Sequence, residues 1–373
     1  MRGLYIAFQP LVSSSGITNK IISQRNGLSN NGILSDLCYQ KDIQGKIFYY
    51  INDNPLFCIG SHSIAHLSLY FRYGPIYKYI TKNSISFVYI RYFQFATPFF
   101  LFFLRRLKRQ GITVFMEIPT YPYDSEAKGG VFKKVLQAIE QRCRKKFSKY
   151  VKRIVTVQNY NYILGIKTIK ISNGIDVNQI KLRDPQKHSG TNIIAVAHMC
   201  NWHAYDRIIE GLGLFYKYRQ PHVAHLYLIG SASDNIRNMY LDIINKYNIG
   251  SYVHMVGVKD GAALDYYFDI ADIAIGCLGC HRKGVSDAKP LKCVEYATRG
   301  IPFIYSENNS DFDTAPFVKK VPADETPINV ESIIEFYKNN SFEPEIIRNY
   351  VEERLTWDSQ MKKVSDELDK MLD

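Results

Sequence analysis

The chain lacks any uncharged apolar run of about 18 residues, the length that a membrane-spanning helix needs. Its longest candidate, residues 93–104, ends at two arginines. Residues 4–8 form an apolar run that is too short for the central region of a secretory signal peptide. The seven cysteines are odd in number and scattered, which favours a reducing compartment. We therefore expect a cytoplasmic protein without a spanning helix.

Paired metal-binding motifs and dinucleotide fingerprints are also missing. Cys277 and Cys280 form a single C-x-x-C motif, which has no partner pair for zinc and does not open a helix directly. We expect ordinary buried thiols there, with a metal or a redox role as the alternatives. No G-x-G-x-x-G run accompanies the first loop, residues 9–16, so Gly16 is interpreted either as part of a phosphate-binding turn or as a simple tight turn.

Negative charge is scarce in the first half of the chain. Residues 1–180 hold 25 of the 47 Lys and Arg residues but only 8 of the 35 Asp and Glu residues, a balance of +17. The remaining 22 bases face 27 acids, a balance of −5. This asymmetry and the length of 373 residues predict two domains, the first of which meets a polyanion or an anionic membrane surface.

Residues 272–306 combine a strand, a polar loop, a helix and a second strand. The apolar run 273–275 stops at Gly276, and helical spacing begins at Leu291. Strands and helices also alternate through residues 193–271, which predicts a parallel sheet covered on both faces. In doubly wound sheets, a loop between a strand and the following helix lies at the carboxyl ends of the strands, where ligands bind.

The start of this helix predicts an anion-binding site. Lys289 and Lys292 stand in or beside the first turn, where the helix dipole disfavours a cation unless an anion shares the site. A phosphate would satisfy both the lysines and the free N–H groups of the helix. Glu295 lies one turn further along and could reach a hydroxylated ligand.

The same stretch resembles the donor-sugar signature of GT-B glycosyltransferases, in particular the family 4 retaining enzymes that build bacterial capsules and O-antigens. In that family, two acids separated by seven residues hold the donor. Glu295 matches the second acid and Asp287 the first, shortened by a methylene. Leu291 and Lys292 match the neighbouring P-L-K pattern. The resemblance implies that Asp287, Leu291 and Glu295 bind the donor, with Glu295 on the ribose.

The resemblance covers nearly the whole chain and implies a fold. It predicts an α/β protein of the GT-B class, with two Rossmann-like domains whose parallel sheets face a central cleft. Residues 1–180 would form the acceptor-binding domain, completed by a C-terminal helix over 356–373, and residues 190–355 the nucleotide-sugar domain. The N-G-I-D run at 173–176 resembles the motif that closes the first domain, and the polar residues 181–192 are interpreted as a linker.

Further donor contacts follow from the same resemblance. In the family, an Arg and a Lys after the first strand of the second domain stabilise the departing diphosphate. Histidines stand at both positions here, His198 and His203. The charge would then come from Arg207, Arg282, Lys283 or Lys292, and we expect Lys292 with Arg207 to supply it. Each histidine could instead belong to the core or the surface. Three more residues are predicted to approach the diphosphate, the nucleotide and the base, respectively: Gly16, Gly230 and Val258.

Glu117 ends a strand-like run and leads into the loop I-P-T-Y-P-Y-D-S-E. This phrase resembles one on the acceptor side of capsular and O-antigen glycosyltransferases. Glu117 is therefore a catalytic candidate that would orient or deprotonate the acceptor hydroxyl. The alternative is a strand-end carboxylate that pairs with a local base.

Two segments of the first half could meet a membrane. Residues 131–152 predict a helix with an apolar stripe and a dense basic face, which an anionic lipid surface would attract; a solvated charged face is the alternative. Residues 93–110 predict either a buried crossover helix or an amphipathic anchor. No nucleic-acid-binding motif accompanies the basic residues, so no nucleic acid is expected as a partner.

Together with these features, the resemblance implies a glycosyltransferase. It would move a sugar, with retention, from a nucleotide-diphosphate sugar to a hydroxyl of a glycan that is linked to undecaprenyl diphosphate, at the inner face of the membrane. The resemblance implies no cofactor and no metal, so cationic side chains and helix N-termini would stabilise the leaving diphosphate. The alternatives are a nucleotide-sugar epimerase of GT-B architecture and a non-catalytic basic protein that binds polyanions.

Overall fold

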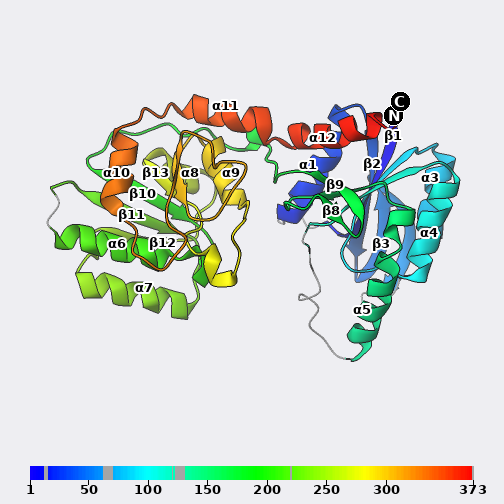
Figure 1. The fold of residues 1–373 in the computed structure, drawn as a ribbon, viewed down its shortest axis with the longest axis horizontal. Coiled ribbons are helices and arrows are strands. Elements are labelled where there is room, and N and C mark those ends of the chain that lie inside the picture. Colours follow the sequence, from blue (N-terminus) through cyan, green and yellow to red (C-terminus); the bar gives the residue numbers. More distant parts are fainter. Residues whose placement is uncertain (12–15, 62–69, 120, 122–130, 219–220, 372–373) are drawn as a thin grey trace. The chain divides into compact units, whose positions relative to one another are not determined.

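The protein is described by a computed structural model over residues 1–11, 16–61, 70–119, 121, 131–218 and 221–371 (Figure 1). The chain divides into two compact units, each considered by itself below. Unit 1 comprises Met1–Gly174 and Trp357–Asp373, and unit 2 comprises Ile175–Thr356. Within the described residues, no helix has the length and apolar character needed to cross a bilayer.

Unit 1 is built on a nine-stranded sheet in the order β4-β3-β2-β1-β5-β6-β7-β9-β8. Strands β2, β1, β5, β6, β7 and β9 are parallel to their neighbours, whereas β3 and β4 extend one edge and β8 the other with antiparallel pairs. The described elements in chain order are β1 (Arg2–Pro10), α1 (Gly16–Asn30), β2 (Leu34–Ile43), β3 (Lys46–Ile51), β4 (Asn54–Ser61), α3 (Gly74–Lys82), β5 (Phe87–Arg91), α4 (Pro98–Arg109), β6 (Thr113–Glu117), α5 (Val131–Arg144), β7 (Arg153–Thr156), β8 (Tyr162–Ile163), β9 (Ile166–Lys170) and α12 (Trp357–Asp369).

The central strand β1 shows why helices cover both faces of this sheet. Its residues are apolar in succession, and side chains along a strand point to alternate faces. Leu4 and Ile6 enter the core cluster that contains α3 and α4. Tyr5 and Ala7 enter the cluster that contains α1 and α12. The long apolar stretch at 93–110 is therefore a crossover helix, α4, although Phe99 and Phe102 on it remain exposed.

Unit 2 holds a six-stranded, fully parallel sheet in the order β12-β11-β10-β13-β14-β15. Counted within the unit, this is the strand order 3-2-1-4-5-6 of a doubly wound sheet, with its switch point between β10 and β13. The elements are β10 (Thr191–Val196), α6 (Tyr205–Lys217), β11 (Ala224–Ile229), α7 (Asp234–Tyr247), β12 (Val253–Gly257), α8 (Gly261–Asp269), β13 (Ile273–Ile275), α9 (Leu291–Thr298), β14 (Phe303–Tyr305), β15 (Val318–Lys320), α10 (Val330–Lys338) and α11 (Pro344–Arg354).

The helices of unit 2 also divide between the two faces of their sheet. Residues of α6, α7 and α10 share one core cluster. Residues of α8, α9 and α11 share the other. The strands at 273–275 and 303–305 are buried throughout, as their apolar runs predict for a parallel sheet. The α/β class and the two Rossmann-like units are thus as predicted.

The polar stretch 181–192 is not a separate linker. Arg183 within it is buried, and its Nε donates to the carbonyl oxygen of Gly300 at 3.0 Å. The backbone N–H of Arg183 also donates to the carbonyl oxygen of Arg299 at 3.0 Å. This stretch therefore belongs to unit 2, which begins at Ile175 rather than at residue 190. Its polarity reflects side chains that bond to backbone, which a polarity pattern alone does not distinguish from solvent exposure.

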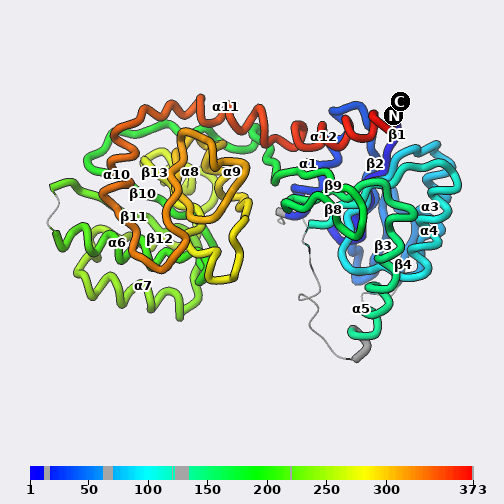
Figure 2. The backbone as a smooth tube through the Cα atoms, viewed as in Figure 1, coloured from blue at the N-terminus to red at the C-terminus, as the bar shows by residue number. Residues whose placement is uncertain are grey.

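Helix α12 carries the chain back to unit 1, where it lies beside α1 (Figures 1 and 2). Two glycines permit this close approach. A Cβ at Gly27 would lie 2.8 Å from the carbonyl oxygen of Trp357, and one at Gly174 would overlap its ring. Met361 and Leu368 of α12 are fully buried against the sheet. Helix α12 therefore belongs to unit 1.

Removal of this packing should destabilise unit 1. We expect Met361→Ala to lower the free energy of unfolding by about 2–5 kcal/mol, because a buried side chain is replaced by a cavity. Lys362→Ala is the matched control: its side chain is 64% exposed, and it should change stability by less than about 0.5 kcal/mol. The chain has two tryptophans, Trp202 in unit 2 and Trp357 in unit 1. In a Trp202→Phe background, urea unfolding followed by fluorescence therefore reports unit 1, and equal midpoints for both variants would contradict the packing role.

Candidate functional site

The carboxyl ends of β10 and β13 meet at the switch point of unit 2. These strands are neighbours in the sheet, so the loops that follow them emerge at the same edge. The loop after β11 packs closely against them, because Gly230 has a φ of +125° and a Cβ there would overlap the carbonyl oxygen of Ala197. Glycine is thus required at position 230 for backbone contact. A nucleotide contact by Gly230 stays a prediction.

Lys292 lies in the first turn of α9 at this edge. Its Nζ donates to the hydroxyl of Tyr205 at 3.1 Å and lies 5.6 Å from the centroid of that ring. Across the described part of the chain, Lys292 forms no ion pair. Lys289 differs, because its Nζ pairs with Asp311 Oδ1 at 2.7 Å. The protein itself thus neutralises one of the two lysines, and Lys292 keeps an uncompensated charge beside the helix start.

His203 is buried next to Tyr205 and presents a hydrogen-bond donor. Its Nδ1 accepts the backbone N–H of Cys200 at 3.0 Å, so the neutral imidazole carries its proton on Nε2. Its ring stacks on that of Tyr205, with centroids 5.4 Å apart. His203 and Lys292 are therefore brought together around Tyr205. His198 is exposed after β10, and its Nδ1 lies 2.6 Å from Ser231 Oγ in the next loop.

Of the two acids predicted to bind the donor, Glu295 lies within α9 and Asp287 lies before it. Glu295 is in its second turn, where Oε1 accepts from Arg299 Nε at 3.0 Å and the side chain is partly exposed. Asp287 is exposed and precedes the helix; its Oδ2 accepts from Ser286 Oγ at 2.8 Å, and its backbone bridges to Asn308. The exchange of glutamate for aspartate at 287 leaves a short side chain that is held by its own loop.

Two apolar residues at this edge are open to solvent. Leu291, the first residue of α9, is 54% exposed, and Val258, after β12, is 70% exposed. Apolar side chains in such positions could cover the faces of a bound nucleotide. Gly16 is the first residue of α1 in unit 1, and residues 12–15 before it lie outside the described residues. Roles for Leu291, Val258 and Gly16 in donor binding stay predictions.

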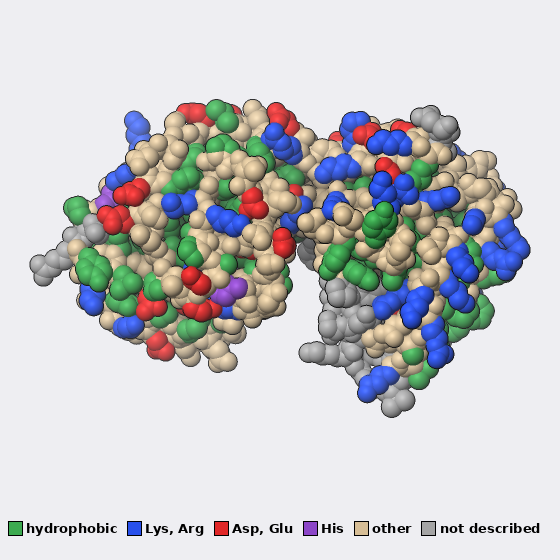
Figure 3. All heavy atoms as spheres, in the orientation of Figure 1, with side chains coloured by type: hydrophobic (Ala, Val, Ile, Leu, Met, Phe, Trp, Pro, Cys, Tyr) green, Lys and Arg blue, Asp and Glu red, His purple; other side chains and the backbone are tan. Residues whose placement is uncertain are grey.

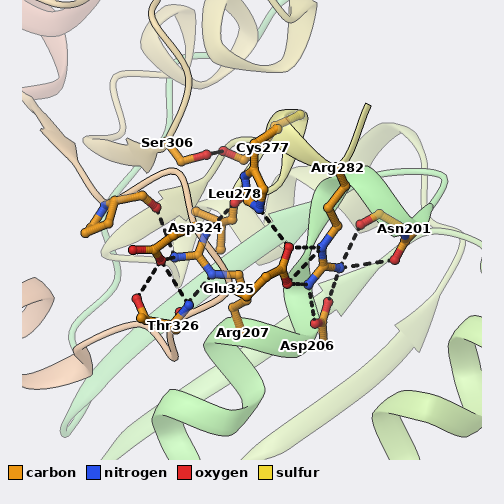
Figure 4. Close-up of polar contacts among 12 residues, drawn as sticks. Asn201, Asp206, Arg207, Cys277, Leu278, Arg282, Ser306, Asp324, Glu325 and Thr326 are labelled. Atoms are coloured by element: carbon orange, nitrogen blue, oxygen red, sulfur yellow. Dashed lines mark hydrogen bonds and ion pairs between the residues drawn. The ribbon is translucent and has the colours of Figure 1, made fainter. Parts of the chain in front are cut away.

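Arg207 is a structural residue, which corrects the prediction that it contacts the diphosphate. It is 2% exposed, and its guanidinium donates to the carbonyl oxygens of Thr326, Pro322 and Leu278 (Figure 4). It also pairs with Asp324 at 3.2 Å. These contacts anchor the segment 322–328 to the loop after β13. The resemblance did not distinguish a buried arginine from a ligand-facing one, because the partners of Arg207 are backbone oxygens from distant segments.

Arg282 forms a second clamp beside Arg207. Its guanidinium makes two bonds to Asp206, at 2.9 and 2.7 Å, and pairs with Glu325 at 2.6 Å (Figure 4). The hydrogen bond from Arg282 lowers the pKa of the Glu325 carboxyl to about 2. Arg282 also donates to the carbonyl oxygen of Asn201 at 2.9 Å. The loops after β10 and β13 are therefore held in one arrangement by a network that no short motif predicted.

A cluster of buried sulfur and oxygen atoms lies under the same loop. The ligand atoms of Cys277, Cys280 and Glu307 are within 4.8 Å of one another. Burial raises the pKa of the Glu307 carboxyl to about 8. A hydrogen bond from Cys280 lowers the pKa of the Cys277 thiol, and His203 and Lys292 act in the same direction. The two cysteines are buried as expected, but Glu307 was not predicted to be their neighbour.

Glu117 ends β6 at the carboxyl edge of the unit 1 sheet, where it is 1% exposed. Its Oε1 lies 2.7 Å from Arg91 Nη1 and 3.3 Å from Lys20 Nζ. Its Oε2 accepts from the hydroxyls of Tyr89 and Tyr5 at 3.1 and 3.3 Å. Burial by itself would raise the pKa of Glu117, but Arg91 and Lys20 together lower it. These contacts are those of the alternative interpretation, an ion-paired carboxylate, and a catalytic role for Glu117 stays a prediction.

Comparison with known proteins addresses the fold. No protein-family model matches the chain, and no curated protein matches it in sequence. Solved structures do match over its whole length. A glycosyltransferase from Rickettsia africae ESF-5 has a TM-score of 0.62 at 12% identity, covering 100% of this chain and 98% of that one. Anabaena HepE in complex with UDP has a TM-score of 0.59 at 10% identity, covering 99% and 100%.

A third similar structure is sucrose-phosphate synthase from Thermosynechococcus elongatus. Its TM-score is 0.58 at 13% identity, and the match covers 100% of this chain and 98% of that chain. The likeness to these three structures extends over both units of the present chain. The chain therefore has the GT-B fold, as the sequence predicted.

The Glu117 cluster predicts acid-sensitive stability in unit 1. We expect Glu117→Gln to lower the free energy of unfolding at neutral pH by about 3–5 kcal/mol, because Arg91 and Lys20 lose their buried counter-charge. Since the pKa of Glu117 is lowered by folding, its ionised form stabilises the protein above the unfolded-state pKa, and this is lost as pH falls through the folded value. Urea unfolding at a series of pH values should show a smaller acid-dependent loss in Glu117→Gln than in wild type.

The control for this prediction is Glu353→Gln, whose side chain is 68% exposed in a weak ion pair. It should change stability by less than about 1 kcal/mol at any pH. An unchanged urea midpoint for Glu117→Gln would contradict the ion-pair role. Loss of activity in a stable Glu117→Gln protein would instead support the acceptor-binding role.

Proposed function

We propose that the protein is a glycosyltransferase that transfers a sugar from a nucleotide-diphosphate sugar to a hydroxyl group of a glycan, with retention of configuration. The observation that carries the proposal is Lys292, which has an uncompensated charge in the first turn of α9 at the switch point of unit 2. A diphosphate is a ligand that such a charge and the free N–H groups of a helix start would bind together.

The whole-chain likeness to glycosyltransferase structures supports this class of reaction. The structure of HepE was solved with UDP and also with UDP-glucose, which makes nucleoside-diphosphate sugars the first donors to test. In our proposal, the diphosphate of the donor binds beside Lys292, while the free carboxylate oxygen of Glu295 accepts from the ribose. Leu291 and Val258 would contact the apolar faces of the nucleotide.

The proposed reaction breaks the bond between the sugar C1 and the diphosphate oxygen and forms a bond between C1 and the acceptor oxygen. The acceptor approaches from the face of the departing diphosphate, so the configuration at C1 is retained, and the diphosphate accepts the hydroxyl proton. Negative charge then grows on the leaving oxygen. Lys292 and the Nε2–H of His203 would stabilise that charge without a metal ion at the diphosphate. Tyr205 holds Lys292 in place through its hydroxyl.

The acceptor is proposed to be a lipid-linked glycan, with undecaprenyl diphosphate as the carrier, at an anionic membrane surface. Helix α5 and the residues after it carry a basic face in unit 1 (Figure 3). Lys145, Lys146 and Lys149 on this face are exposed. Exposed aromatic residues of α4, Phe99 and Phe102, would add interfacial contacts in the same unit. Such an enzyme acts in surface polysaccharide synthesis at the inner face of the membrane.

Variants of the donor site test the proposal. We expect Lys292→Ala to lower kcat by about 10²–10³-fold, because a charge that stabilises the leaving group is lost. Glu295→Gln should weaken donor binding, which would appear as a higher KM. Lys246→Ala on α7 is the control, because Lys246 is exposed and distant in the fold from the switch-point loops. Full turnover by both site variants would remove the site assignment.

Binding and product analysis distinguish the proposed function from its rivals. A donor at 100 times its Kd should stabilise the wild-type protein by about 2.7 kcal/mol. NMR of the product should show the anomeric configuration of the donor. Donor consumption in the absence of any acceptor would favour an epimerase instead. Steeply salt-dependent binding to nucleic acid, with no affinity for nucleotide sugars, would favour a polyanion-binding protein.

Membrane binding is tested separately. A triple variant should bind phosphatidylglycerol vesicles more weakly by about 3 kcal/mol, since each basic residue contributes roughly 1 kcal/mol near an anionic surface. It combines Lys145→Gln, Lys146→Gln and Lys149→Gln. The matched control replaces three exposed lysines of unit 2, Lys217, Lys246 and Lys259, with Gln. Co-sedimentation with vesicles measures the binding of both triple variants. Equal loss in the two triple variants, or binding to neutral phosphatidylcholine vesicles alone, would contradict a role for this face.

A further inference from the structure

A second chemical site lies beneath the loop that leads to α9. Cys277 follows β13, and Cys280 opens the short 3-10 turn Cys280–Lys283. Glu307 follows β14, which is the parallel neighbour of β13. Because the two strands end at the same edge of the sheet, the loops after them meet there. Their backbones are joined where the N–H of Ser306 donates to the carbonyl oxygen of Cys277 at 3.0 Å.

Glu307 is the unusual member of this group. It is 2% exposed, and neither of its carboxylate oxygens has a hydrogen-bond partner. A buried carboxylate without a partner is costly, so such a group generally pairs with a cation or coordinates a metal. The nearby Lys292 directs its ammonium to the hydroxyl of Tyr205. The two thiols of Cys277 and Cys280 are the groups whose ligand atoms lie within 4.8 Å of the Glu307 carboxylate.

We propose that Cys277, Cys280 and Glu307 are three ligands of a buried site for a thiophilic divalent cation, Zn²⁺, whose tetrahedral shell a water molecule would complete. Two sulfurs and a carboxylate oxygen are a ligand set that zinc accepts, whereas Mg²⁺ and Ca²⁺ prefer oxygen alone. Two thiolates bound to one zinc ion at about 2.3 Å each lie at most about 4.6 Å apart. The three groups, which are within 4.8 Å of one another, therefore close on an ion with shifts of about an ångström.

The charges of the three ligands and the neighbouring His203 also bear on the binding of an ion. Two thiolates and a carboxylate carry three negative charges, and a zinc ion would balance two of them. Because the Nδ1 of His203 already accepts from the backbone N–H of Cys200, its Nε2 keeps the proton of the neutral ring, so His203 is not a ligand of the ion.

A bound ion would hold two loops of unit 2 together. Zinc would join the loop after β13 to the loop after β14 beneath the segment that leads to α9. The three protein ligands are all buried, so the ion would lie beneath the loop and would not contact the diphosphate of a donor. The inference does not rest on the proposed transferase activity, because it follows from the three ligands alone.

Metal analysis tests the proposal on the full chain. Protein purified without chelators should contain about one zinc per chain, and the metal-depleted protein should bind Zn²⁺ and Co²⁺ with the same stoichiometry. The Co²⁺ form should show a sulfur-to-metal charge-transfer band and the visible bands of tetrahedral cobalt. Cys277→Ser, Cys280→Ser and Glu307→Gln should each weaken Zn²⁺ binding by more than about 100-fold, since loss of a neighbouring group alone costs 10–100-fold.

The matched control is Cys293→Ala, which removes a fully buried cysteine of α9 that is not one of the three ligands. It should keep one Zn²⁺ per chain and the cobalt spectrum. Circular dichroism establishes that each variant is folded. Absence of zinc and of the cobalt charge-transfer band in folded wild type would overturn the proposal. Full Zn²⁺ affinity in folded Cys277→Ser or Cys280→Ser, or a Cys277–Cys280 disulfide in protein kept under reducing conditions, would overturn it as well.

Discussion

The parallel pairing of β10 with β13 is the constraint on which the candidate site depends. It places strands that are far apart in the chain side by side, so that their carboxyl ends open at one edge of the sheet. Lys292 after β13 can approach Tyr205 and His203, which both follow β10, only because of this pairing. The helices contribute less directly, since they cover the sheet and orient the first turn of α9.

Charged groups divide into two kinds around this edge. Arg207 and Arg282 are satisfied within the protein. They donate to backbone oxygens and pair with Asp206, Asp324 and Glu325, and these contacts hold the loops together. Lys292 instead meets a neutral hydroxyl and retains its charge. An anion-binding function is therefore best sought at a cation such as Lys292, to which the described residues offer no paired carboxylate.

In unit 1, a charged group at a strand end is likewise paired within the protein. Glu117 stands at the strand end where a parallel sheet would present a ligand-facing group, yet two cations and two tyrosines surround it. Its position in the sequence predicted the strand end correctly. The partners that decide its chemistry, Lys20 and Arg91, come from other elements that local sequence reasoning could not bring together.

Apolar runs and helical spacing determined the strands, the helices and the two-unit α/β fold, because these depend on local periodicity and on which faces must be buried. The C-x-x-C motif and the lysines at the start of α9 were also visible in the sequence. Tertiary structure alone decided that Arg207 is structural, that Lys289 pairs with Asp311, and that Glu307 lies beside two thiols. Each of these contacts joins segments that are distant in the chain, and the partner of a charged side chain is set by the strand order of the sheet rather than by the residues next to it.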